Sequence, residues 1–205
     1  YIQGVYVDPE LEKSMDKENR QQLEISQRVE SQGEAMALAQ KYPRLHNKYA
    51  KIASFTIDHN RLQPGMYLAR RDGDIVTLDL RFKKPNMGDL LSNSELHSTE
   101  HLVATALRNG EAKEAVIYFG PMGCQTGFFF LFDERKLTLE GAVALMKKAF
   151  AEAAAFEGEM PGKSPIECGN YINLDVETGR AVCRWYSELI RDWTVERLSY
   201  DWQGK

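Results

Sequence analysis

Apolar and polar residues alternate along residues 75–82, and from Val76 onward every second position is apolar. This period of two predicts a β-strand with one buried face, and it puts Arg81 on the opposite face. The Asp72-Gly73 pair before this strand is a turn signal, and residues 54–59 are typical of the entry to another strand.

Three later segments have the pattern of helices. Ser92-x-x-Glu95 forms a capping box for a helix that ends at Asn109-Gly110. Thr138 is placed to cap an alanine-rich helix that reaches about Phe156, and a last helix is expected from about Val176 to Trp193.

Two short apolar runs, 116–119 and 128–132, predict strands, and the loop between them contains three glycines. Helices and strands thus intermix, and the strands are placed as hairpins. This order predicts an α+β fold in which an antiparallel sheet packs against helices.

Residues 1–52 differ in composition from the remainder of the chain. They are rich in Glu, Gln, Lys, Arg and Ser, and their apolar residues are irregularly spaced. We predict an N-terminal polar helical extension over residues 1–52 and a globular domain over residues 53–205.

Charge and cysteine content narrow the possible functions. A net charge of -4 offers no basic surface for nucleic acid, so no nucleic-acid partner is expected. No apolar run has the length of a membrane span, and no signal peptide is visible, so no membrane association is expected. Three cysteines form an odd, sparse set, which argues against a disulfide framework and favours a reducing cytoplasm.

The segment His97-Ser98-Thr99-Glu100-His101 carries the chemistry of this chain. Histidines four residues apart on a helix point the same way and can bind one metal ion. Glu100 lies close enough to act on a substrate or water at that ion. So short a motif also occurs by chance on an ordinary exposed helix. Whether it is a metal site therefore depends on other residues of the chain.

The three cysteines have different surroundings. Cys168, which precedes Gly169 in a predicted loop, is a plausible third ligand, because a thiolate binds borderline-soft divalent ions well; the alternative is a half-buried packing residue. Cys124 lies among glycines, where the backbone can approach a ligand, and it could act as a proton shuttle or be a structural loop cysteine. Cys183, in the last predicted helix, is expected to pack in the core.

Five blocks of the sequence resemble the LuxS family of S-ribosylhomocysteine lyases, in the family's order and with similar spacing, over about residues 53–195. They are Ser54-Phe55-x-x-Asp58-His59-Asn60, Asp79-x-Arg81-Phe82-x-x-Pro85-Asn86, His97-x-x-Glu100-His101-Leu102, Pro121-Met122-Gly123-Cys124-Gln125-Thr126-Gly127 and Glu167-Cys168-Gly169-Asn170. The block around Cys124 is the most specific. The extension and Lys83, at a position that is often Cys, depart from the family pattern.

The resemblance implies an activity and a set of roles. Members cleave the thioether of S-ribosylhomocysteine to homocysteine and 4,5-dihydroxy-2,3-pentanedione, a quorum-signal precursor, by two carbonyl shifts and a β-elimination. They use one divalent metal ion per subunit, Fe²⁺ in the native state and often Zn²⁺ as purified, and they are homodimers with shared active sites. The implied metal ligands are His97, His101 and Cys168, the acid/base groups Glu100 and Cys124, and the substrate-binding residues Ser54, His59 and Arg81.

Two other functions remain open from the residues alone. An H-x-x-E-H metallopeptidase would use Glu100 to activate water, and a carboxylate as third ligand would favour it over the lyase, whereas Cys168 favours the lyase. A non-catalytic metal-binding paralogue would keep the ligands as a scaffold. The presence of both Glu100 and Cys124 argues against that scaffold, because a structural metal site needs neither.

Overall fold

The computed structural model describes residues 57–200, so the predicted extension 1–52 and Ser54 lie outside the described residues. Within this range the chain forms a four-stranded sheet in the order β1-β2-β4-β3, and every neighbouring pair is antiparallel. The strands are β1 (Gly65–Asp72), β2 (Ile75–Arg81), β3 (Val116–Pro121) and β4 (Gly127–Asp133).

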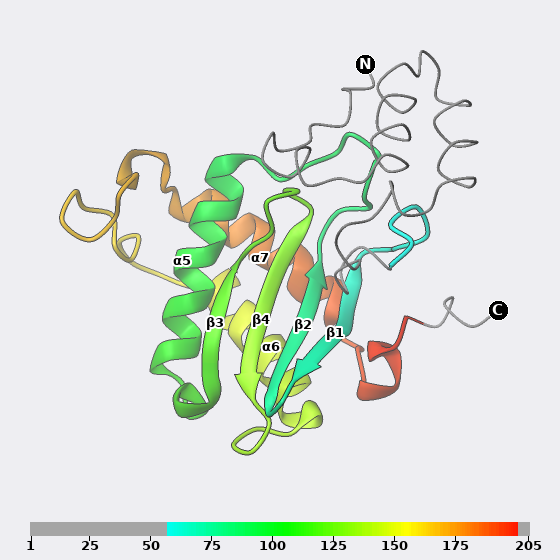
Figure 1. The fold of residues 1–205 in the computed structure, drawn as a ribbon. Helices are drawn as coiled ribbons and strands as arrows, with labels where there is room; N and C mark the ends of the chain where they lie inside the picture. Colours follow the sequence, from blue (N-terminus) through cyan, green and yellow to red (C-terminus); the bar gives the residue numbers. More distant parts are fainter. Residues whose placement is uncertain (1–56, 201–205) are drawn as a thin grey trace, which may run out of the picture. The chain divides into compact units, whose positions relative to one another are not determined.

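Three α-helices accompany the sheet: α5 (Asn93–Asn109), α6 (Leu139–Ala154) and α7 (Val176–Ile190). Short 3₁₀ turns are η2 (Lys113–Ala115), η3 (Tyr171–Asn173) and η4 (Val195–Leu198). In Figure 1, α6 and α7 lie behind the sheet and α5 runs beside β3. The predicted α+β class is confirmed. None of the helices within residues 57–200 has the length and apolar character needed to cross a membrane.

The predicted alternation of β2 divides the sheet into two faces. Its apolar side chains pack against the helices, and Phe82 stacks on Tyr186 of α7 at a centroid distance of 3.8 Å. Leu78 and Leu80 are paired in the sheet with Phe130 and Phe128, so the buried face continues across β4. Asp79 and Arg81 lie on the other face, as the period of two predicts.

Residues 57–59, predicted as part of a strand entry, form a turn instead. The carboxylate of Asp58 accepts a hydrogen bond from the backbone N–H of Asn60 at 3.0 Å, and its carbonyl accepts one from Arg61 at 3.1 Å. A short polar side chain that bonds its own backbone competes with a strand. The strand that precedes β2 is β1, which the sequence pattern did not reveal beyond its closing turn.

The last helix ends at Ile190, three residues before the predicted Trp193. The indole N–H of Trp193 donates to the carbonyl of Met66 at 2.8 Å, and the ring covers Gly65, where an added Cβ would clash with the ring. Packing of this one large side chain on β1 therefore outweighs continuation of the helix.

Candidate active site

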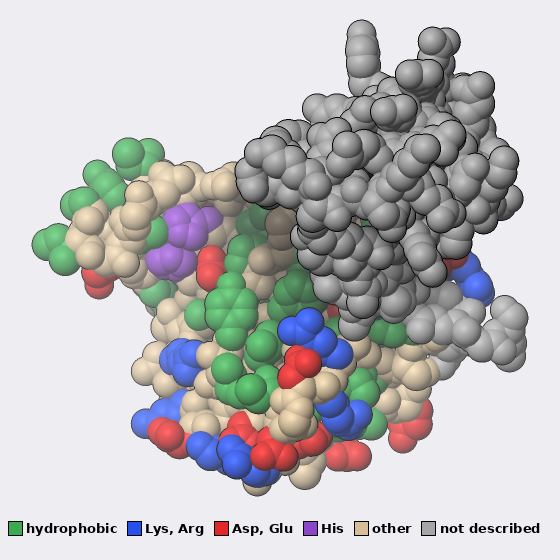
Figure 2. Space-filling model, in the orientation of Figure 1, with side chains coloured by type: hydrophobic (Ala, Val, Ile, Leu, Met, Phe, Trp, Pro, Cys, Tyr) green, Lys and Arg blue, Asp and Glu red, His purple; other side chains and the backbone are tan. Residues whose placement is uncertain are grey.

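Helix α5 brings the two histidines together. The capping box is present as predicted: the hydroxyl of Ser92 accepts from the N–H of Glu95 at 3.3 Å, and the Glu95 carboxylate accepts from the N–H of Ser92 at 2.7 Å. One turn further, the rings of His97 and His101 lie 4.7 Å apart. Figure 2 shows histidine side chains at the surface over this end of α5.

Cys168 lies beside the two histidines, although its loop follows His97 by 71 residues in the sequence. Its Sγ lies 3.2 Å from Nε2 of His97, and ligand atoms of His97, His101 and Cys168 all lie within 4.8 Å of one another. Ligand atoms about 2.0–2.3 Å from a tetrahedral ion lie roughly 3.3–3.8 Å apart. The three side chains thus have the donor atoms and nearly the spacing for one divalent ion with an open fourth position.

Both imidazoles are oriented by an outer hydrogen bond. Nδ1 of His97 donates to the side-chain oxygen of Asn173 at 2.6 Å, and Nδ1 of His101 donates to the carbonyl of Pro161 at 2.8 Å. With the proton on Nδ1, each ring keeps its lone pair on Nε2. This arrangement is typical of metal-binding histidines.

Gly162 supports the His101 ring from behind. Its φ is +69°, a left-handed conformation that favours glycine, and an added Cβ would lie 2.9 Å from Nδ1 of His101. Any larger residue would push the ring away from its bond to Pro161. The glycine therefore contributes to the position of one candidate ligand.

The loop around Cys168 is fixed by its own hydrogen bonds. The hydroxyl of Ser164 donates to the Glu167 carboxylate at 2.6 Å, and the N–H of Cys168 donates to the carbonyl of Ser164 at 3.0 Å. The N–H of Asn170 lies 3.4 Å from the sulfur of Cys168 and donates to it. This backbone donor helps to hold the sulfur beside His97.

Replacing Asn173 by alanine is expected to weaken metal binding about 10- to 100-fold, as loss of an outer partner of a ligand histidine typically does. The dissociation constant of Zn²⁺ measured by competition with a chelating dye checks this. Asn170→Ala is the matched control, because Asn170 serves the sulfur through its backbone N–H, which alanine retains. Equal affinity of the Asn173→Ala protein and the wild type would contradict the expectation.

Glu100 lies on α5 between the two histidines and is half-buried. Burial raises the pKa of its carboxyl group above the ordinary value, and the charges of His101 and His97 act in the opposite direction. A carboxylate with a raised pKa is a stronger base, so it accepts a proton more readily than an ordinary carboxylate. This suits Glu100 to the acid/base role predicted for it.

Arg81 and Cys124 meet on the face of the sheet opposite the core. Nε and Nη2 of Arg81 donate to the two oxygens of Asp79 at 3.1 and 2.6 Å, and both side chains are buried. Nη1 donates to the hydroxyl of Thr126 at 2.5 Å and approaches Sγ of Cys124 at 3.7 Å. Two of the three guanidinium nitrogens of Arg81, the predicted substrate-binding residue, are therefore bonded to Asp79. Only Nη1 faces the thiol of Cys124.

A cavity of about 530 Å³ contains this second group, and His59 lines it together with Arg81 and Cys124. The ring of His59 is held by a bond of 2.9 Å between Nδ1 and the carbonyl of Ile57. Among residues 57–200, the cavity lining includes none of the metal-ligand candidates and not Glu100. The predicted site residues thus form two groups within the described part of one chain.

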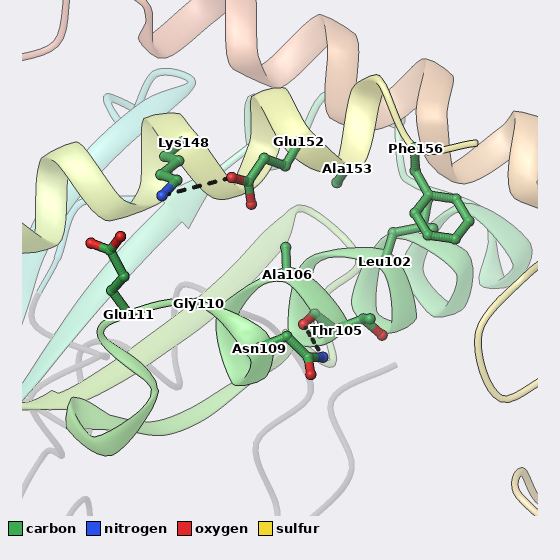
Figure 3. Close-up of a pocket in the computed structure, with 10 residues that line it drawn as sticks. All are labelled: Leu102, Thr105, Ala106, Asn109, Gly110, Glu111, Lys148, Glu152, Ala153 and Phe156. Atoms are coloured by element: carbon green, nitrogen blue, oxygen red, sulfur yellow. Dashed lines mark hydrogen bonds and ion pairs between the residues drawn. The ribbon is translucent and has the colours of Figure 1, made fainter. Parts of the chain in front are cut away.

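Another groove, of about 490 Å³, lies between the C-terminal half of α5 and α6 (Figure 3). Its floor includes Ala106 and Ala153, and Lys148 and Glu152 form an ion pair of 3.9 Å at its edge. It contains none of the predicted ligands or acid/base groups. The chemistry of the site therefore lies elsewhere on the molecule.

Sequence reasoning did not identify Asn173, Pro161, Gly162 and Asp79 as parts of these groups. Asn173 and Pro161 contact histidines of α5 from which they are separated by sixty residues or more in the sequence. No local sequence pattern indicates such contacts. Asp79 is part of the strand and of a block that resembles the family, but the sequence gives it no role of its own. Cys183, by contrast, is buried in the core as predicted, and burial raises the pKa of its thiol to about 12.

An α+β fold that carries two imidazoles, a thiol and a carboxyl group in this arrangement defines a metalloenzyme-type site. The family model described as S-ribosylhomocysteinase (LuxS) matches residues 52–196. The chain belongs to this family.

Curated relatives agree with that membership. The chain is 40% identical over 155 residues to an S-ribosylhomocysteine lyase of Clostridium acetobutylicum and 40% identical over 156 residues to one of Desulfotalea psychrophila. It is 37% identical over 159 residues to one of Borreliella burgdorferi. Each match covers 73% of this chain and 98% of the relative.

Proposed function

We propose that this protein is a carbon–sulfur lyase that cleaves S-ribosylhomocysteine to homocysteine and 4,5-dihydroxy-2,3-pentanedione, the quorum-signal precursor. The observation that carries the proposal is the convergence of His97, His101 and Cys168 on one point, with Glu100 beside them. Relatives that match this chain over nearly their whole length are named for the same reaction.

The donor set fits one divalent metal ion per subunit, bound by His97, His101 and Cys168 with an open position for substrate oxygens. We infer Fe²⁺ as the native ion and Zn²⁺ as an ion acquired on purification. When bound, the ion supplies Lewis-acid polarisation of a carbonyl group. Cys168 also favours the lyase over an H-x-x-E-H metallopeptidase, whose third ligand is generally a carboxylate.

Glu100 and Cys124 move the protons of the reaction. The carbonyl of the sugar has to shift twice along its chain, and each shift removes a proton beside the carbonyl and returns one to the neighbouring carbon. Nη1 of Arg81, 3.7 Å from Sγ of Cys124, favours negative charge on the sulfur and so its use as a base. After the second shift, removal of one more proton expels homocysteine by β-elimination.

We infer a homodimer whose active sites each take residues from both chains. Within residues 57–200 no hydrogen bond joins the group at Cys124 to the metal ligands, although one substrate needs both. The cavity with His59, Arg81 and Cys124 of one subunit would then face the ligands and Glu100 of the other. Ser54, outside the described residues, is proposed to join the former group and bind substrate with His59 and Arg81.

Mixing two inactive variants tests this arrangement. Coexpressed Cys124→Ala and Glu100→Gln chains, each with its own affinity tag, are expected to form mixed dimers with about half of wild-type activity, because each mixed dimer has one intact site of two. The measurement is homocysteine release by dimers purified through both tags. Inactive mixed dimers would show that each site is built from one chain.

We further propose that residues 53–205 form the catalytic domain, that residues 1–52 are an extension to it, and that the enzyme acts in the cytoplasm. The direct test of the activity is incubation of metal-loaded protein with S-ribosylhomocysteine, followed by a thiol reagent. Release of homocysteine supports the lyase. The absence of release by metal-loaded protein would favour a non-catalytic metal-binding paralogue.

A further inference from the structure

The Arg81–Cys124 pair is connected to the C-terminal segment of the chain. The hydroxyl of Tyr200 donates to Oδ2 of Asp79 at 3.2 Å, and this same oxygen accepts Nη2 of Arg81 at 2.6 Å. Asp79 is 2% exposed and Arg81 is 3% exposed, so water does not compete for these bonds. Tyr200 lies beyond residue 196, where the match to the family model ends.

The ring of Tyr200 has a defined place on the sheet. It stacks on Tyr67 of β1 with a centroid distance of 4.9 Å and an interplanar angle of 18°. Tyr67 is the residue paired with Asp79 across the β1–β2 ladder, so the stack puts the Tyr200 hydroxyl over the carboxylate. Trp193, edge-on to Tyr67 at 5.8 Å, anchors the start of the same segment.

We propose that Tyr200 is a positioning residue for the Arg81–Cys124 pair: through Asp79 it fixes the guanidinium beside the sulfur. The inference rests on the proposed function only for the importance of Cys124 in the reaction. The geometry is a chain of contacts from the Tyr200 hydroxyl through the Asp79 carboxylate and the Arg81 guanidinium to Sγ of Cys124.

Electrostatics gives the direction of the effect. Burial raises the pKa of Asp79, while the charge and hydrogen bonds of Arg81 and the hydrogen bond from the Tyr200 hydroxyl act in the opposite direction. Burial and the charge of Asp79 raise the pKa of Tyr200 far above its ordinary value, so this hydroxyl keeps its proton as a donor. A carboxylate that shares its charge with Tyr200 neutralises Arg81 less, which leaves more positive potential at Cys124.

Loss of the hydroxyl therefore weakens the support for negative charge on the sulfur. Other charged or titratable side chains that line the same cavity are His59, Arg70 and Tyr118, and Tyr200→Phe changes none of them. Phenylalanine also retains the stacked ring, so the variant removes the hydroxyl that donates to Asp79 with little loss of packing.

The test is alkylation of Cys124 in the full-length protein by iodoacetamide, followed by mass spectrometry of the peptide that contains this residue. Tyr200→Phe is expected to slow alkylation at pH 7 about three- to tenfold and to move the pH profile of the rate upward, because the thiolate is the reacting form. Lyase turnover is expected to fall through kcat, with KM little changed.

Tyr67→Phe is the matched control, because it removes a hydroxyl from the same stack that donates to the backbone carbonyl of Gln63, not to Asp79. Its alkylation rate is expected to stay near that of the wild type. In an Arg81→Met background, Tyr200→Phe should have no further effect, since the guanidinium carries the coupling.

A rate for Tyr200→Phe equal to the wild type, or equally slow rates for both tyrosine variants, would overturn the inference. If Arg81→Met does not fold, the alkylation rates of Tyr200→Phe and Tyr67→Phe alone test the inference. Alkylation requires no substrate, so a wild-type protein without lyase activity would refute the proposed function and leave this result in place.

Discussion

Replacement of Cys168 by alanine is expected to abolish metal binding and lyase activity together. The thiol is one of three candidate ligands, and its sulfur lies 3.2 Å from Nε2 of His97. Two imidazoles alone form a site of low affinity, because each lost ligand removes a strong bond to the ion. Metal content after gel filtration and homocysteine release from S-ribosylhomocysteine are the two measurements.

Cys183→Ala is the control for loss of a thiol as such. Cys183 is a buried residue of α7 that does not belong to the candidate ligand cluster, and alanine nearly fills its place. This variant should retain both the ion and the activity. Full metal occupancy in Cys168→Ala would remove the basis for the three-ligand site.

Replacement of Glu100 by glutamine is expected to lower kcat about 10²- to 10⁴-fold, the usual contribution of a positioned acid/base group. Glutamine has the shape of glutamate but cannot exchange a proton at neutral pH. The metal content should remain that of the wild type, since the ligand set does not include Glu100. Steady-state kinetics with metal analysis of the same sample separates the two effects.

Glu95→Gln on the same helix is the matched control. Among the described residues, the bond of the Glu95 side chain is the one in the capping box, where glutamine can also accept from the N–H of Ser92. Its activity should stay near the wild-type level. An active Glu100→Gln enzyme would assign the proton transfers to another group.

Elements encoded by neighbouring residues were predictable. The start of α5 follows from Ser92 and Glu95, and the faces of β2 follow from strict alternation, because both depend on contacts within a few residues. Strand β1 gave no such signal: its first three residues are buried, its last three are exposed, and its pairing with β2 is shifted between Leu68 and Arg70. Its place is set by packing and not by its own pattern.

The same distinction holds for the site. His97, Glu100 and His101 share one helical turn, so their proximity is local. Residue type made Cys168 a plausible ligand, but only resemblance to a family favoured this role over packing. The outer partners depend on side chains meeting across the fold, and Asn173 also bonds the side chain of Asn93 at the start of α5. The engagement of Arg81 by Asp79 required the side-chain geometry, since the strand pattern gives only their common face.

One short stretch, residues 161–173, contains the candidate ligand Cys168 and orients both imidazoles through Pro161 and Asn173. Substitutions confined to this stretch can retune the preference for one ion over another while the histidine helix stays constant. During evolution, changes in this stretch can therefore alter metal binding while Glu100 and Cys124 stay the same.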